Sequence, residues 1–318
     1  MPDDRPDNPL MDRELSWLSF SHRVLQEARD PSVPLFERLF FCGIFSSNLD
    51  EFFRVRVASL RSLLRLGAKD HGKLGINPHR LLHDIHRTVL AQQEEYGQIL
   101  GGLMDELRQE GVRIVDNHTV GEEHHEWLRT FFETEVREHL TAVPLESDEG
   151  GMPFLENQGV YLVVEVWPED SSTLTTWRPS YSLVEVPCPP LDRFVTLPGS
   201  DEGAQVMFLD DVIRFNLDGV FPDHGIGRSY AVKLTRDADL HLEDEFDVDL
   251  VDAIRKSLSK RDTGVPSRFL YDGKAPYVLI HSLQHDLALV DEDIVLGARY
   301  HNLNDYMGFP RFGRADLS

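Results

Sequence analysis

The feature that most constrains this chain is an aromatic-rich stretch at residues 13–56, whose apolar residues follow helical spacing on both sides of a polar interruption. Residues 34–45 predict a short buried helix, because a proline suits the first helical turn and the apolar positions that follow fit one helix face. Three polar residues ending at Asn48 then break the pattern. Asn48 with Glu51, or Ser47 with Asp50, has the form of a capping box, so a second and longer helix is predicted to start near Asn48.

The first turn of that second helix is a candidate binding site. The leading N–H groups of a helix have no intrahelical partner and carry a partial positive charge, which suits a phosphate or the polar edge of a ring. The alternative is that Asn48 only caps the helix. Arg54, Arg61 and Arg65 recur on one face of the same helix, where they either meet phosphate oxygens or form a solvated rim.

Several segments together resemble one protein family. They are residues 13–57, 233–239, 267–272 and 297–302, the last followed by 305–310. In this order and at this spacing they resemble the polyphosphate kinases, which reversibly move a phosphoryl group between ATP and polyphosphate. The resemblance covers almost the whole chain. It implies a helical amino-terminal domain, a mixed head domain and two catalytic domains of the phospholipase D type, of which only the first two are expected here.

The histidine that the family phosphorylates lies in a segment reading roughly Ile-His-Ala-Lys, and no histidine of this chain matches that segment. His71, His281 and His301 all stand in other sequence contexts. Phosphoryl transfer needs a nucleophile, charge neutralisation and in-line positioning in one pocket. We therefore predict no catalytic residue in this chain and no activity of the chain alone.

The resemblance also implies ligands and partners. Asn48 is expected to contact ATP, with the adenine enclosed between the helical domain and the first catalytic domain, and the head domain is expected to take part in a homodimer. Lys233 and Arg236 join the three arginines above as candidates for phosphate or interface contacts. At Arg236 the alternative is a helix cap with an ion pair. We also expect the complete enzyme to contact polyphosphate and its catalytic domains to bind Mg²⁺.

The predicted function is therefore that of the amino-terminal and head portion of a polyphosphate kinase, contributing nucleotide contact and dimerisation. The alternative is a stand-alone, non-catalytic regulator or partner subunit that senses nucleotide or polyphosphate. An autonomous enzyme of another kind would need a base and nucleophile pair or a metal cluster, and the sequence contains no motif for either.

Composition narrows the class further. The net charge of −23 over 318 residues argues against a nucleic-acid-binding surface, so any contact with a polyanion has to use local cations. The apolar runs are short and the acidic start lacks an apolar segment, so we expect neither a membrane span nor a secretory signal, and a cytoplasmic location. Cys42 and Cys188 predict free thiols, because their spacing fits no disulfide or metal framework.

The chain is predicted to be α+β, with a tail at residues 1–11, a helical domain at 12–117 and a mixed head domain at 118–318. Asn77 and Pro78 predict the cap and first turn of a helix that continues to Gly111. In the head we expect helices at 122–140, 205–217 and 242–258 on one side of a mainly antiparallel sheet with strands at 159–167, 181–186 and 229–235.

Two groups of residues suggest a metal at first sight. His79, His83 and His86 share one face of the long helix, but no acid or cysteine cluster accompanies them in the sequence. The acidic run at 237–252 lacks the spacing of a calcium loop. We therefore predict no metal site and interpret the acidic run as a solvated helix face.

Overall fold

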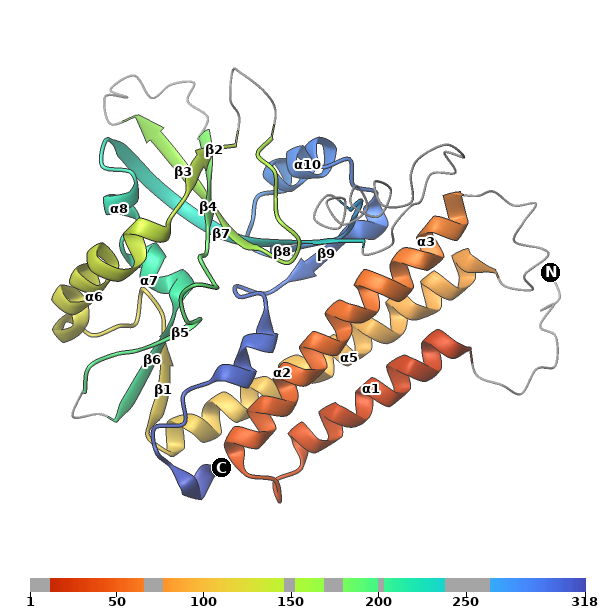
Figure 1. The fold of residues 1–318 in the computed structure, drawn as a ribbon, viewed down its shortest axis with the longest axis horizontal. Helices are drawn as coiled ribbons and strands as arrows, with labels where there is room; N and C mark the ends of the chain where they lie inside the picture. Colours follow the sequence, from red (N-terminus) through yellow and green to blue (C-terminus); the bar gives the residue numbers. More distant parts are fainter. Residues whose placement is uncertain (1–11, 66–76, 146–151, 169–179, 200–202, 238–263) are drawn as a thin grey trace, which may run out of the picture.

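A computed structural model describes residues 12–65, 77–145, 152–168, 180–199, 203–237 and 264–318 (Figure 1). The predicted tail at 1–11, the predicted helix at 242–258 and most of the acidic run lie outside the described residues. The prediction of an α+β fold is confirmed. A helical region is followed by a mixed region whose large sheet is mainly antiparallel.

The helical region consists of rods that run side by side (Figure 1). They are α1 (Arg13–Arg29), α2 (Leu35–Glu51), α3 (Ala58–Arg65) and α5 (Pro78–Gln109), and a π-helical turn (Phe52–Val57) joins α2 to α3. Their apolar faces form one core, in which Leu18, Leu39, Phe53 and Leu103 are almost completely buried.

The prediction that a second helix starts near Asn48 is wrong. The α2 helix runs through this position, and the carbonyl of Asn48 accepts a hydrogen bond from the N–H of Phe52. Phe45, Leu49 and Phe52 are buried on both sides of the polar residues, so core packing keeps the helix continuous where the local pattern favours a break. No helix begins at this position, so it does not offer the unpaired N–H groups that were expected to bind a phosphate.

The predicted start and length of the α5 helix are confirmed. The side chain of Asn77 accepts a hydrogen bond from the N–H of Arg80 (3.2 Å), Pro78 occupies the first turn, and Gly111 follows the helix with φ of +77°. Its 32 residues correspond to about 48 Å at the usual helical rise.

The mixed region begins with a small sheet in which β1 (Val112–Val115) lies parallel to β6 (Ala204–Phe208), and β5 (Phe194–Thr196) lies antiparallel to β6. The prediction of a helix over residues 205–217 is wrong in its first part, because residues 205–208 belong to β6 and the helix α7 (Leu209–Phe215) starts only after them. Val206 faces the core of the helical region and Met207 faces a second core, so both faces of β6 are buried. A strand covered on both faces lacks the period-two alternation that would have revealed it.

The large sheet has the strand order β2-β4-β3-β7-β8-β9, and every neighbouring pair is antiparallel except β8 and β9. Its strands are β2 (Ala142–Pro144), β3 (Val160–Pro168), β4 (Ser180–Glu185), β7 (His224–Arg236), β8 (Pro266–Asp272) and β9 (Ile294–Gly297).

Helices cover both faces of this sheet, which corrects the expectation of helices on one side only. The predicted helix at 122–140 is helical throughout, as α6 (His125–Phe131) flanked by π-helical and 3₁₀ turns, and it shares a core with α7 and one face of the sheet. On the other face, α10 (Tyr277–Asp286) packs Leu279 and Leu283 against Val163 and Val232. The short helix α8 (Leu217–Val220) follows α7.

The end of the chain returns to the helical region (Figure 1). A 3₁₀ helix at Leu303–Gly308 lies against α2, and the ring of Phe309 packs against Phe36 and Phe194. The helical region and part of the mixed region thus share one core, and the division at 117/118 stays a prediction.

At Gly43 the α2 helix closely approaches this 3₁₀ helix. A Cβ atom there would lie 2.6 Å from Cγ and 2.9 Å from the backbone nitrogen of Met307. Gly43→Ala is therefore expected to lower the free energy of unfolding by about 1–3 kcal/mol through overpacking, measured by urea denaturation. Gly101→Ala on α5 is the matched control, because a Cβ there meets nothing within 4 Å, and it is expected to raise stability by about 0.5–1 kcal/mol. Equal stability of the two variants would contradict this interpretation of Gly43.

Candidate functional site

A buried cluster of charges joins the helical region to the large sheet. Lys233 Nζ of β7 donates to Asp50 Oδ2 of α2 at 2.6 Å, and Arg268 Nη1 of β8 donates to Asp50 Oδ1 at 3.2 Å. The exposed fractions are 8% for Asp50, 1% for Lys233 and 2% for Arg268. Charges removed from water to this degree have to be paired, and one carboxylate here serves two cations.

The π-helical turn after α2 shapes this cluster. It buries both Phe52 and Phe53, and the guanidinium carbon of Arg268 lies 4.3 Å from the ring centroid of Phe53. Burial lowers the pKa of the Arg268 guanidinium, and the charge of Asp50 opposes that effect. π-helical turns inside α-helices occur frequently at functional sites.

A cavity of about 340 Å³ lies beside the charge cluster, between the helical region and the sheet. Such a volume suits a small organic ligand. Its walls come from α2, α5, strands β7 to β9 and the segment that follows β9. The lining includes Phe45, Ser46, Leu49, Asp50, Tyr96, Gly97, Lys233, Arg268, Leu270, Gly297, Tyr300, His301 and Asn302.

Two buried polar atoms of this lining have no hydrogen-bond partner among the described residues, namely Tyr96 Oη and Arg268 Nε. The Tyr96 ring stacks on Phe45 with a centroid distance of 5.6 Å. Burial also lowers the pKa of His301 to about 4, so its imidazole is neutral at pH 7, with Nε2 placed 3.1 Å from the carbonyl oxygen of Ala231. The cavity therefore offers an apolar, aromatic wall together with donors, which suits a planar group that carries hydrogen-bond acceptors.

The segments that suggested a family resemblance meet at this cavity. Asp50 belongs to the first of them, Lys233 to the second, Arg268 to the third and His301 to the fourth, and all four residues line the cavity. Lys233 and Arg268 follow Asp50 by 183 and 218 positions in the sequence, and both contact its carboxylate.

The other residues predicted for binding have different positions. Asn48 is half-buried within α2, next to the lining residue Leu49, but it does not itself line the cavity. Arg54 forms a surface ion pair with Glu51 at 2.8 Å. Arg61 is engaged with Asp293 and with backbone carbonyls of Ser267 and Glu292.

Arg236 lies at the end of β7. Its guanidinium donates to the carbonyls of Leu155 (3.0 Å) and Gly264 (2.9 Å) and stacks over Phe154. The side chain of Arg65 lies outside the described residues. Among the predicted cations whose side chains are described, Lys233 alone lines the cavity, and the predicted arginine face does not gather at one site.

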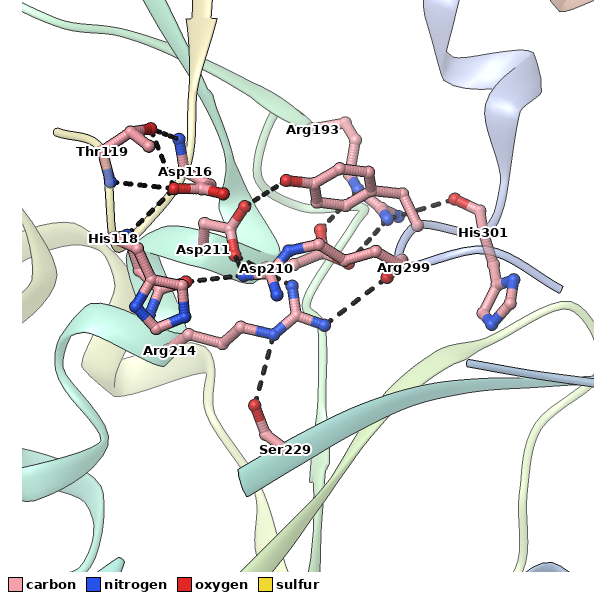
Figure 2. Close-up of polar contacts among 12 residues, drawn as sticks. Asp116, His118, Thr119, Arg193, Asp210, Asp211, Arg214, Ser229, Arg299 and His301 are labelled. Carbon is pink, nitrogen blue, oxygen red and sulfur yellow. Dashed lines mark hydrogen bonds and ion pairs between the residues drawn. The ribbon is translucent and has the colours of Figure 1, made fainter. Parts of the chain in front are cut away.

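Sequence reasoning missed a second network, built around two adjacent acids at the start of α7 (Figure 2). Arg193 Nε lies 2.8 Å from Asp210 Oδ2, and Arg193 also reaches Asp305 at 3.3 Å. Burial raises the pKa of Asp305 to about 6, and the charge of Arg193 opposes this shift.

Asp211 accepts from three groups: Arg214 Nη1 at 2.9 Å, Arg299 Nη2 at 2.5 Å and Tyr300 Oη at 2.5 Å. The only signal for this network in the sequence was a pair of acids inside the apolar run 206–213, since buried acids require partners.

No described group of three or more histidine, cysteine, aspartate or glutamate side chains has the geometry to hold a metal ion. Cys42 and Cys188 are free thiols. Within the described ranges, every helix is too short or too polar to cross a membrane.

Comparison with known proteins identifies two matching family models. The model described as the polyphosphate kinase N-terminal domain matches residues 10–115, and the model described as the polyphosphate kinase middle domain matches residues 123–309.

Similar proteins carry the same description. A polyphosphate kinase from Vibrio parahaemolyticus is 34% identical over 314 residues, and one from Escherichia coli K12 is 35% identical over 315 residues; each alignment covers 96% of this chain and 44% of the relative. A crystal structure of a polyphosphate kinase from Porphyromonas gingivalis has a TM-score of 0.79 and 31% identity, over 97% of this chain and 42% of that one. The chain thus spans less than half the length of these relatives.

Proposed function

Because the chain belongs to the polyphosphate kinase family, as its motifs indicated, we propose that it forms the amino-terminal and middle portion of an enzyme that reversibly transfers the terminal phosphoryl group of ATP to polyphosphate. The observation that carries this proposal is the convergence of four motif segments on the cavity between the helical region and the sheet. In this role the chain contributes nucleotide contact and self-association, and the phosphorylated histidine and the Mg²⁺ sites belong to catalytic domains outside it.

The proposed nucleotide contact involves Asn48 through its side-chain amide. An asparagine amide both donates and accepts hydrogen bonds, so it can recognise the polar edge of a purine. Asn48 lies one residue from Leu49 and two from Asp50, which both line the cavity, so a nucleotide that touches Asn48 would also lie close to the charge cluster. Lys233 and Arg268 supply positive charge on that side.

The test uses the chain mixed with a separately produced catalytic half. The wild-type chain is expected to restore ATP-dependent polymer formation, whereas neither half forms polymer alone. Asn48→Ala is expected to raise the KM for ATP about tenfold, which corresponds to the loss of one hydrogen bond of about 1.4 kcal/mol. The matched control is Gln26→Ala, which removes an exposed side-chain amide of α1 that does not border the lining residues of α2, with an unchanged KM expected.

Two outcomes would contradict the proposal. An unchanged KM in Asn48→Ala would remove Asn48 from the nucleotide contact. Failure of the wild-type halves to form polymer together, although they associate in sedimentation, would contradict the enzymatic role. Tight ATP binding by the isolated chain would instead favour a stand-alone nucleotide sensor. Sedimentation of the chain alone also tests self-association, for which a dimer is expected.

A further inference from the structure

A second cavity, of about 480 Å³, lies in the mixed region and shares no lining residue with the first. It is bounded by the loop after β1, by α7 and α8, by the first half of β7, and by the turn that follows β8. Its position and its residues separate it from Asn48 and from the proposed nucleotide contact.

The lining of this cavity is strongly cationic. Arg214, Arg228, Lys274 and Arg299 all contribute to it, against the single carboxylate of Asp272. A cluster of four permanent cations is unexpected in a chain whose net charge is −23. Such a local concentration of one sign inside a concave surface attracts ligands of opposite charge.

Three neighbouring carboxylates do not line the cavity and accept hydrogen bonds from protein donors. Asp211 accepts hydrogen bonds from Arg214, Arg299 and Tyr300 (Figure 2). Glu165 accepts from the Tyr230 hydroxyl at 2.9 Å, and Asp116 accepts from the Thr119 hydroxyl at 2.8 Å. Together with Asp272, these acids equal the four cations in number, but Asp272 is the only one of the four acids that lines the cavity, so the lining itself carries an excess of positive charge.

Two of the guanidinium groups are held in fixed positions. Arg214 Nε donates to the Ser229 hydroxyl at 3.2 Å and its Nη1 donates to Asp211 (Figure 2). Arg299 Nη2 donates to Asn117 Oδ1 at 2.6 Å and to Asp211, while Arg299 Nε is buried without a partner among the described residues. Arginines positioned in this way need little reorganisation to accept the oxygens of a bound anion.

Arg228 and Lys274 differ from this pair because both are exposed. They add two exposed positive charges, which suit a ligand that carries several negative charges. The lining includes His118 and Tyr230 but no stacked aromatic pair like the one in the first cavity. A compact and highly charged anion fits these features better than a base or a sugar does.

We propose that this cavity is a binding site for a multivalent phosphate anion, held by Arg214 and Arg299 within it and by the exposed cations Arg228 and Lys274. The site is separate from the nucleotide contact and does not depend on it. The same chemistry is offered by a free inorganic phosphate chain and by the triphosphate of a nucleotide.

The experiment titrates the protein with tripolyphosphate in a calorimeter and compares two double variants with equal loss of charge. Arg228→Gln/Lys274→Gln removes the exposed cations of the cavity. Arg87→Gln/Arg108→Gln removes two exposed cations of α5 that form only surface ion pairs. The cavity variant is expected to bind tripolyphosphate at least about tenfold more weakly than the wild type, because two charged contacts with the anion are lost. The α5 variant is expected to change affinity less than about twofold, since exposed charges far from the site are screened.

Further titrations distinguish the sources of the phosphate. ATP binding at this site is expected to fall in the cavity variant and to remain in Asn48→Ala, whereas orthophosphate should bind more weakly than tripolyphosphate if a phosphate chain is the natural ligand. Equal tripolyphosphate affinity of the two double variants would overturn the proposal, as would an affinity that falls only in Asn48→Ala. Urea denaturation of both variants shows whether they remain folded, which is expected because all the substituted side chains are exposed.

Discussion

Asp50→Ala is expected to lower the free energy of unfolding by about 3–5 kcal/mol, as breaking a buried ion pair on one side generally does. Lys233 and Arg268 are almost completely buried and both donate to this carboxylate. Without it, both cations stay in a low-dielectric setting with no acid in hydrogen-bonding contact. Urea denaturation followed by circular dichroism measures the change, and an unchanged denaturant slope would show that the loss affects stability itself.

The adjacent acid provides the matched control. Glu51 pairs with Arg54 at 2.8 Å, but the two side chains are 53% and 35% exposed and the pair lies at the surface. Glu51→Ala is therefore expected to change stability by less than about 0.5 kcal/mol, since exposed ion pairs contribute little. If Asp50→Ala proves as mild as Glu51→Ala, water must reach the cluster, and Asp50 would not be the group that joins the helical region to the sheet.

The sequence predicted the helical region best where local signals and burial agree. The α5 helix has its cap at Asn77, a proline in the first turn and apolar residues at helical spacing, and each of these is determined within a few residues. Core packing only reinforces what the local sequence already favours there, so the boundaries could be predicted closely.

The errors arose where tertiary burial overrides the local pattern. Three polar residues ending at Asn48 favour a helix break, but Phe45 and Phe52 are buried in the same core on either side of them. Residues 206–208 carry apolar side chains compatible with helix or strand, and they belong to a central strand because β1 and β5 pair with it on both edges. Strand pairing of this kind depends on residues about 90 positions away, as with Val112 and Ala204, and no local window contains that information.

The candidate sites were harder to predict than the fold. The motif segments contained Asp50, Lys233, Arg268 and Arg299, but nothing in their spacing shows that the first three form one ion cluster or that Arg299 belongs to a different cavity. The predicted phosphate face of Arg54 and Arg61 assumed that arginines on one helix face point to one ligand. In the structure Arg61 binds Asp293 and so connects α3 to the mixed region.

Asp211→Ala is the second substitution with a large expected effect, again a loss of about 3–5 kcal/mol in the free energy of unfolding. Its carboxylate is fully buried and accepts from Arg214, Arg299 and Tyr300 at 2.9 Å or less. Only 3% of the Arg214 side chain is exposed, so without Asp211 its charge would lose its closest acid and gain little contact with water. The control is Asp218→Ala, which removes an exposed ion pair with Arg129 and is expected to change stability by less than about 0.5 kcal/mol. Thermal and urea denaturation of both variants measure the difference. Equal stability would mean that Arg214 and Arg299 find other partners, and the cationic cavity would then lack the fixed guanidinium groups on which phosphate binding depends.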